Sequence, residues 1–304
     1  MKKTKYALLL LFSLLSATHP LRAQEDTNQS PDEVLQLVRN LKYQQGEIDL
    51  RGGLARLSVP AEFNYLGPDD AETVLVKLWG NPPSETKPLG LLLPAGMTPL
   101  NTNCWVVTID YTEEGYVKDG DASTINYDDL LKTMQKAVAE QNVERQKQGY
   151  RTVELVGWAA PPRYDAATHK LYWAKELEFS GSTHHTLNYN IRLLGRKGVL
   201  QLTAVARMSS FPEIDQQTPK ILAMVDFKEG SRYADFDPKM DKVAKYGIAA
   251  LVAGGLVVAA KAGLLKVFLV GLLAMKKFII IGVVAFWAAI KKMFSRRGSS
   301  SGSP

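Results

Sequence analysis

Cysteine is almost absent from this sequence, because Cys104 is the only one among 304 residues. A lone cysteine excludes an intramolecular disulfide framework and a cluster of thiolates around a metal. Cys104 opens the apolar run Cys-Trp-Val-Val-Thr-Ile, which predicts a strand with a buried thiol. We therefore expect Cys104 to be structural and not a nucleophile.

Sequence signatures of enzymes and metal sites are missing as well. Outside the Gly/Ser-rich tail from Gly298, the chain has no Gly-x-Ser-x-Gly pattern in which a serine could form a nucleophile elbow, and it has no His-Glu-x-x-His or phosphate-loop pattern. The acidic stretch that begins at Asp119 invites a calcium site, but an EF-hand needs glycine and glutamate where this sequence has Thr124 and Leu130. The pair His184-His185 lies in a predicted turn between strands, where neighbouring side chains point to opposite faces. The sequence thus predicts no catalytic residue, no cofactor and no metal site.

Basic residues are scarce in the middle of the chain and concentrated at its ends. Residues 1–23 hold four of the 37 lysines and arginines, and residues 239–304 hold eleven, against a single acidic residue, Asp241. The remaining 22 basic and 30 acidic residues give residues 24–238 a net charge of −8. An acidic domain argues against nucleic-acid binding, since phosphate contacts need a basic face. The basic C-terminal region instead suits anionic lipid headgroups.

The first 23 residues predict a secretory signal peptide. Lys2, Lys3 and Lys5 precede a short apolar run, and the segment closes on Leu-Arg-Ala before a polar stretch that begins at Gln24. The apolar run is shorter than the roughly 20 residues that a bilayer span needs. Export together with a single cysteine is typical of the periplasm of a Gram-negative bacterium.

Long apolar runs lie near the C-terminus and predict a membrane anchor over residues 239–297. Residues 246–265 suit one span, and the positive-inside rule then keeps the basic residues beyond it in the cytoplasm. The alternative is a hairpin with a second span over about 267–290, which would export the last two arginines. Residues 298–304 are rich in glycine and serine and predict a flexible tail.

A row of small residues at four-residue spacing lies in the first predicted span, at Gly255, Ala259 and Gly263. Such a row lets membrane helices approach closely, so one prediction is self-association, with a pore-like assembly as its extreme form. The alternative is that glycine and alanine are simply common in membrane helices.

Residues 24–238 predict one α+β domain, a mainly antiparallel sheet with flanking helices. Residues 127–148 carry an apolar stripe of helical period, with Asn126 as the cap and Gly149 as the terminator. Four strands with short connections follow and favour an antiparallel meander, at residues 152–159, 170–179, 186–194 and 198–207. With the anchor, the predicted fold class is α+β plus a C-terminal transmembrane helical region.

Several long strings of the sequence are distinctive. Examples are Leu78-Trp-Gly-Asn-Pro-Pro, Gly157-Trp-Ala-Ala-Pro-Pro-Arg-Tyr-Asp, Leu187-Asn-Tyr-Asn-Ile-Arg-Leu-Leu-Gly-Arg-Lys-Gly-Val-Leu and Asp241-Lys-Val-Ala-Lys-Tyr-Gly-Ile-Ala-Ala-Leu-Val-Ala-Gly-Gly. In these strings the chain resembles the bacterial membrane-anchored proteins grouped as DUF2167. The resemblance covers nearly the whole mature chain. It implies a membrane-anchored protein of uncharacterised function and supplies no catalytic residue.

Aromatic and basic residues concentrate in the meander, which gives the best functional lead. Alternation along each strand puts one set of side chains into the core and leaves the other as an aromatic and arginine-rich surface, the composition of binding patches. The alternative is a set of core aromatics with snorkelling cations. The predicted binding surface comprises Trp158, Arg163, Tyr164, Tyr172, Tyr189, Arg192 and Arg196.

The first functional hypothesis is a non-enzymatic protein of the bacterial inner membrane, whose periplasmic domain binds an envelope partner through the meander. Other expected partners are membrane lipids at the basic C-terminal region and further copies of the chain through the membrane helices. The alternative is a membrane-bound periplasmic hydrolase that uses Asp119, Asp121 or Asp165 with His169. A cleft that joins these residues favours the enzyme, and an exposed aromatic patch favours binding.

Overall fold

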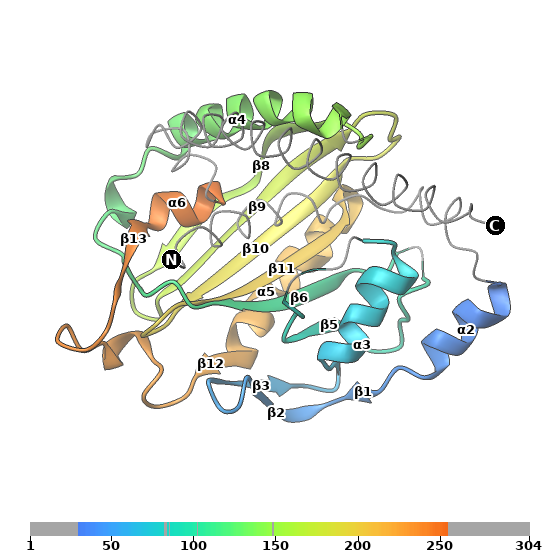
Figure 1. The fold of residues 1–304 in the computed structure, drawn as a ribbon, viewed down its shortest axis with the longest axis horizontal. Helices are drawn as coiled ribbons and strands as arrows, with labels where there is room; N and C mark the ends of the chain where they lie inside the picture. Colours follow the sequence, from blue (N-terminus) through green and yellow to red (C-terminus); the bar gives the residue numbers. More distant parts are fainter. Residues whose placement is uncertain (1–29, 82–83, 85, 102, 148, 255–304) are drawn as a thin grey trace, which may run out of the picture. The chain divides into compact units, whose positions relative to one another are not determined.

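The computed structural model describes residues 30–81, 84, 86–101, 103–147 and 149–254. At the centre of the domain lies an eight-stranded antiparallel sheet with the strand order β1-β4-β5-β6-β11-β10-β9-β8 (Figure 1). Along this order the strands are Tyr43–Gln44 (β1), Phe63–Leu66 (β4), Gly90–Pro94 (β5), Val106–Thr112 (β6), Val199–Arg207 (β11), Thr186–Leu194 (β10), Lys170–Phe179 (β9) and Val153–Asp165 (β8).

Strands β8 to β11 form the antiparallel meander that the sequence predicts, because each strand pairs with the next along the chain. β8 is longer than expected and continues through Pro161 and Pro162 to Asp165. Proline has no N–H to donate, but it is tolerated here because β8 is the outer strand of the sheet. The register of β8 against β9 shifts three times between Leu155 and Arg163, so bulges re-aim the side chains of this strand.

Helices flank the sheet. They are Pro31–Arg39 (α2), Pro68–Glu72 (α3), Thr73–Leu78 (η2), Ala122–Thr124 (η3), Tyr127–Lys147 (α4), Met208–Ser210 (η4), Phe211–Met224 (α5), Tyr233–Asp235 (η5) and Ile248–Ala253 (α6). The predicted long helix is confirmed as α4, and Asn126 caps it by accepting hydrogen bonds of 3.1 Å from the backbone N–H groups of Asp128 and Asp129. Its apolar stripe packs inward through the buried residues Leu130, Met134 and Val138.

Two small sheets complete the domain. A hairpin turns at Gly52-Gly53, and its strands Gly46–Leu50 (β2) and Ala55–Val59 (β3) are joined by Val225–Phe227 (β12) in a sheet of order β12-β3-β2. In the other small sheet, Tyr116–Lys118 (β7) pairs in parallel with Val243–Gly247 (β13).

The two faces of the large sheet bury different cores. The face that we name the α5 face packs against α5, with Leu187 and Tyr189 of β10 in one cluster with Ile214 and Ile221. The opposite face, named the α4 face, packs against α4 and α6 in a second cluster and against α3 and η2 in a third (Figure 1). Because successive strand residues point to opposite faces, a residue's position in its strand decides which core it joins.

The predicted C-terminal transmembrane helical region is wrong for the part of it that the structure describes. Within the described residues, none of the helices is both long and apolar enough to cross a membrane. The start of the predicted span 246–265 instead belongs to the folded domain, as the end of β13 and the short helix α6. Gly254 ends α6 in the left-handed conformation, with φ +63°.

The apolar residues of α6 are used inside the domain. Ile248 and Val252 are fully buried in the same cluster as Met134 of α4 and Trp173 of β9. A run of apolar residues has the same hydropathy whether lipid or a protein core covers it, which explains why the sequence misled us here. The remaining predictions for the two ends of the chain lie outside the described residues and stay predictions. They are the signal peptide at 1–23, the rest of the span 246–265 with its row of Gly255, Ala259 and Gly263, the alternative second span at 267–290, and the tail at 298–304.

Candidate binding pocket

The seven side chains of the predicted binding surface do not form one surface. Strand alternation and the bulges of β8 divide six of them between the two faces of the sheet, and the seventh lies in a turn. The α5 face receives Arg163, Tyr172 and Tyr189; the α4 side receives Trp158, Tyr164 and Arg192; the turn between β10 and β11 holds Arg196.

Three of these residues meet in one hollow on the α5 face, which we name the meander pocket. Its volume is about 200 Å³. Three strands of the meander and helix α5 supply its lining, which consists of Ala159, Ala160, Pro161, Arg163, Tyr172, Tyr189, Phe211 and Asp215. Sequence reasoning missed Phe211 and Asp215, because no local pattern shows that α5 returns to the meander.

The floor and the wall of the meander pocket are linked by a hydrogen bond. The hydroxyl of Tyr189 donates to Oδ1 of Asp215 over 3.3 Å. Tyr189 is only 2% exposed, and burial raises its pKa to about 12, so it stays a neutral donor. At the first turn of α5, Glu213 accepts a 3.0 Å hydrogen bond from the indole N–H of the buried Trp105, which ties the helix to the residue before β6. The pocket is therefore built from restrained parts.

The rim of the meander pocket carries an available positive charge. Arg163 is exposed and lies opposite Tyr172 in the β8–β9 register. None of the described residues forms a hydrogen bond or an ion pair with the Arg163 guanidinium. The pocket thus combines aromatic walls, an arginine without a partner among the described residues, and the carboxylate of Asp215.

Trp158 has a structural role on the other side of β8. Its indole N–H donates to the backbone carbonyl of Tyr127 over 3.3 Å, and its ring packs in the cluster that also holds Trp173. This contact joins the start of α4 to the edge strand. Trp158 is thus partly buried and ties the helix to the sheet.

Tyr164 joins two residues of the hydrolase hypothesis. Its hydroxyl donates to Oδ2 of Asp119 over 2.6 Å and lies 3.0 Å from Nδ1 of His169. The His169 ring stacks on Tyr233 with 4.0 Å between ring centroids. Burial alone would raise the pKa of Asp119, but the hydrogen bonds from Tyr164 and Tyr233 outweigh it and hold that pKa below its ordinary value.

The other acidic residues of that hypothesis are used elsewhere. Asp121 accepts hydrogen bonds from the backbone N–H groups of Ile248 and Ala249, and Asp165 accepts from Ala167 and Thr168 in its own turn. Cys104 lies just before β6 and is half-buried, so the predicted strand with a buried thiol is wrong at this residue. Its partial burial still raises the pKa of the thiol to about 11. Across the described part of the chain, no group of three or more His, Cys, Asp or Glu side chains is arranged to hold a metal ion.

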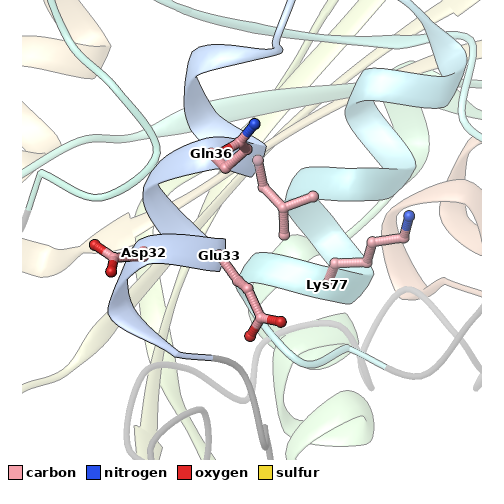
Figure 2. A pocket seen from close by; sticks show the side chains of 5 residues that line it. Asp32, Glu33, Gln36 and Lys77 are labelled. Atoms are coloured by element: carbon pink, nitrogen blue, oxygen red, sulfur yellow. The ribbon is translucent and has the colours of Figure 1, made fainter.

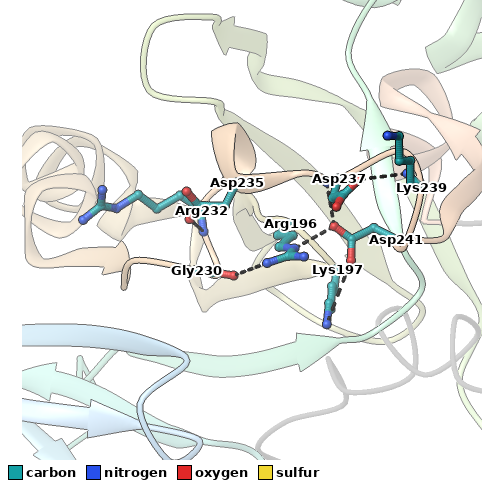
Figure 3. A network of polar contacts seen from close by, with 8 residues as sticks. All are labelled: Arg196, Lys197, Gly230, Arg232, Asp235, Asp237, Lys239 and Asp241. Atoms are coloured by element: carbon teal, nitrogen blue, oxygen red, sulfur yellow. Dashed lines mark hydrogen bonds and ion pairs between the residues drawn. The ribbon is translucent and has the colours of Figure 1, made fainter.

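Arg196 holds the chain together at the end of the meander (Figure 3). Its Nε donates to Oδ2 of Asp241 over 2.6 Å, and an Nη donates to the carbonyl of Gly230 over 3.3 Å. The Asp241 side chain is 2% exposed, and its Oδ2 also accepts from the backbone N–H of Asp237. Arg196 is thus occupied by internal contacts and is not presented to a partner.

A larger hollow, of about 550 Å³, lies between α2 and η2. Its lining is Asp32, Glu33, Gln36, Leu37 and Lys77, none of which the sequence analysis singles out. Figure 2 shows the side chains of Asp32 and Lys77 pointing to opposite sides, so their charges do not converge on a common point. Because α2 buries none of its residues, we regard this hollow as an open gap under a surface helix.

Comparisons with known proteins bear on the family and not on an activity. The profile of a family described as a protein of unknown function (DUF2167) matches residues 42–287. No curated protein matches the chain. The solution structure of cyanobacterial PsbP (CyanoP) from Synechocystis sp. PCC 6803 is 9% identical, and the match covers 62% of this chain and 94% of that chain with a TM-score of 0.33. A likeness this weak carries no argument about this chain.

Proposed function

The chain belongs to the DUF2167 family of proteins of unknown function, and we propose that its described domain is a non-enzymatic binding module that takes a side chain of a protein partner into the meander pocket. The observation that carries the proposal is the convergence of Arg163, Tyr172 and Tyr189 in one hollow. These residues come from three strands, and the pocket brings them together with Asp215 of α5.

The size of the pocket favours an anchor side chain over a free small molecule. Pockets that enclose drug-sized ligands or cofactors measure roughly 300–1,000 Å³. The meander pocket measures about 200 Å³, which suits one side chain of a larger partner. Tyrosine and arginine are also the residue types that dominate binding energy at protein interfaces.

The charges of the pocket indicate what the partner presents. Arg163 lies at the rim and forms no ion pair with the described residues. A carboxylate of the partner, next to its anchor side chain, would therefore form an ion pair with the Arg163 guanidinium. The exposed Asp215 and the buried Tyr189 add oxygen atoms to the lining of the pocket. We propose an anchor that is apolar or aromatic, followed by an acidic residue. The partner is an envelope protein if residues 1–23 export the chain to the periplasm.

Hydrolysis is the second candidate function, and the contact of Tyr164 with Asp119 and His169 favours it. A carboxylate and an imidazole within hydrogen-bond reach of one hydroxyl resemble the parts of acid–base catalysis. Among the described residues, however, no serine or cysteine forms a hydrogen bond to His169, and neither hollow contains any of these three residues. We therefore rank this candidate second.

The proposed function is tested by crosslinking in the cell. A photoreactive residue at position 163 lies at the rim of the meander pocket, and the same residue at exposed position 140 on α4 is the matched control. We expect one discrete adduct from position 163, its loss when Tyr172 is changed to Ala, and no such adduct from position 140. Equal adducts from both positions, or an adduct that survives Tyr172→Ala in a folded protein, would contradict the proposal.

A further inference from the structure

The α4 face of strands β9 and β10 gathers polar side chains that the sequence analysis did not connect. We name them the donor strip: Trp173, Lys175, Asn188, Asn190 and Arg192. Asn190 lies opposite Trp173 and Asn188 lies opposite Lys175 in the β9–β10 register, so the five side chains are neighbours on one face. Each of them is 5% exposed or less. The strip lies on the opposite side of the sheet from the meander pocket.

Arg192 fixes the direction of the hydrogen bonds along β10. A guanidinium only donates, and its Nη2 donates to Oδ1 of Asn190 over 3.1 Å. The amide nitrogen of Asn190 must then be the donor, and it donates to the backbone carbonyl and to Oδ1 of Asn188, over 3.0 and 2.8 Å. The carbonyl oxygen of the Asn188 amide is thereby occupied. The amide NH₂ of Asn188 is the remaining end of this relay.

The relay ends among donors that lack an acceptor. Within the described part of the chain, neither the NH₂ group of Asn188 nor the ammonium of Lys175 has a hydrogen-bond or ion-pair partner. The indole N–H of Trp173, which is 1% exposed, also has none. Burial, with Arg192 nearby, lowers the pKa of Lys175 to about 8. Arg192 has the attraction of the Asp110 carboxylate, two strands away, but no described carboxylate acts on Lys175.

Donors without acceptors destabilise a folded protein unless a bound group accepts their hydrogen bonds. Buried donors in folded proteins are almost always paired, and a charge away from bulk water is destabilising unless an opposite charge or a hydrogen bond compensates it. Here the indole N–H of Trp173 is a fully buried donor without a partner among the described residues. The neighbouring ammonium of Lys175 and NH₂ group of Asn188 are donors as well, and the Arg192 relay prevents Asn188 from turning its oxygen toward them. An acceptor with negative charge would satisfy all three.

From this geometry we propose that the donor strip is an oxyanion site, in which Lys175 and Asn188 bind a carboxylate or a phosphate group beside Trp173. Lys175 supplies the charge and up to three N–H donors, and Asn188 supplies two more. Arg192 and Asn190 are positioning residues, because Arg192 orients the Asn190 amide and Asn190 in turn orients Asn188. The site is independent of the meander pocket and of the function proposed for it.

The experiment uses the full-length chain and two probes, inorganic phosphate and acetate, at constant ionic strength. We expect at least one of them to raise the unfolding temperature saturably and to bind in calorimetry. A response to phosphate alone assigns a phosphate group, and a response to acetate alone assigns a carboxylate. The control Lys136→Met removes an exposed lysine of α4 and should leave the response unchanged. No response of the wild type to either probe would overturn the proposal.

Two variants separate the site from general salt effects. Lys175→Met keeps the unbranched stem without the charge, and it should weaken probe binding by at least about tenfold while folding normally. Asn188→Asp places a carboxylate beside Lys175, so it should abolish the probe response and raise the unfolding temperature without any probe. If Lys175→Met binds the probe as the wild type does, or if Asn188→Asp keeps the wild-type response, the proposal is overturned.

Discussion

Arg196 and Asp241 are joined by a 2.6 Å hydrogen bond between Nε and Oδ2, which ties the turn between β10 and β11 to the segment that leads into β13. The arginine holds the pKa of Asp241 below its ordinary value. Asp241 falls within the region 239–297 that the sequence assigns to an anchor. The contact shows that at least the first part of this region is bound to the domain.

Replacing Arg196 with Gln should therefore loosen the chain on both sides of Asp241. We expect a lower free energy of unfolding in urea and faster amide hydrogen exchange in residues 228–247, because Asp241 loses its charged donor. The matched control is Lys197→Gln, since Lys197 is 57% exposed and its Nζ is 4.0 Å from Asp241. An equal effect of the two substitutions would show that Arg196 does not hold this segment to the turn between β10 and β11.

Asp121 should hold α6 in the domain core in a similar way. Its carboxylate accepts hydrogen bonds from the backbone N–H groups of Ile248 and Ala249, over 3.1 and 3.3 Å. Gly247 permits this, because a Cβ there would lie 2.7–2.9 Å from the carboxylate atoms. Asp121→Ala removes the cap, and we expect a loss of about 1 kcal/mol in stability together with faster hydrogen exchange in residues 248–253.

The control for this prediction is Glu229→Ala, which removes an exposed carboxylate that forms no hydrogen bond or ion pair with the described residues. Stability and exchange should not change in that variant. Unchanged exchange in residues 248–253 of Asp121→Ala would mean that apolar packing alone holds α6 in place.

Local patterns predicted the elements of the fold correctly where one physical signal dominates. The cap at Asn126 and the stripe of Leu130, Met134 and Val138 define α4, and the short connections define the meander. Sequence reasoning failed where a pattern has two physical solutions. The apolar run from Ile248 suits a bilayer and a protein core equally, and the structure uses its first residues in the core.

The candidate site was only half predictable for the same reason. Tyrosine and arginine in the meander indicated binding, and alternation separates two faces, but helices cover both faces of this sheet. The sequence does not show that the bulges of β8 carry Arg163 to Tyr172, or that Asp215 arrives from α5. Nor does it show that Arg192 turns inward, where its hydrogen bonds orient Asn188.

His185 should make stability depend on pH. Its Nδ1 lies 2.5 Å from Oε1 of Glu176, and Glu178 is 3.4 Å from Nε2, so the hydrogen bond and these charges raise the pKa of His185. A histidine whose pKa is higher in the folded state stabilises the fold fully when the pH is below its pKa in the unfolded state, about 6.5. This contribution is lost as the pH rises through the pKa of the folded state. His185→Gln should therefore destabilise the protein at pH 5.5 more than at pH 9.

The adjacent His184 is the control, because its side chain is exposed and forms no ion pair with any of the described residues. Urea unfolding of His184→Gln should run parallel to the wild type at every pH. A His185→Gln variant that differs from the wild type by the same amount at pH 5.5 and pH 9 would contradict the assignment.

Asp110 should also make stability depend on pH, but through an unfavourable contribution that appears as the carboxyl loses its proton. Burial raises its pKa to about 6, against the attraction of Arg192 and a hydrogen bond from Thr108. The folded state thus holds a proton that the unfolded state has lost between about pH 4 and pH 6, so this carboxyl removes stability as pH rises through that window. Asp110→Asn should be more stable than the wild type at pH 8, by on the order of 2 kcal/mol. A pH profile with the wild-type slope between pH 4 and pH 6 would contradict this; Glu229→Gln is the control.

The most direct test of the binding module is the affinity of the crosslinked partner for purified variants, measured by calorimetry. We expect Tyr172→Ala and Arg163→Glu each to weaken binding by at least about tenfold, because a few central residues dominate the binding energy of an interface. The control Arg207→Glu changes an exposed arginine outside the meander pocket and should leave the affinity unchanged. Affinities that are the same for all three folded variants and the wild type would show that the meander pocket is not the binding site.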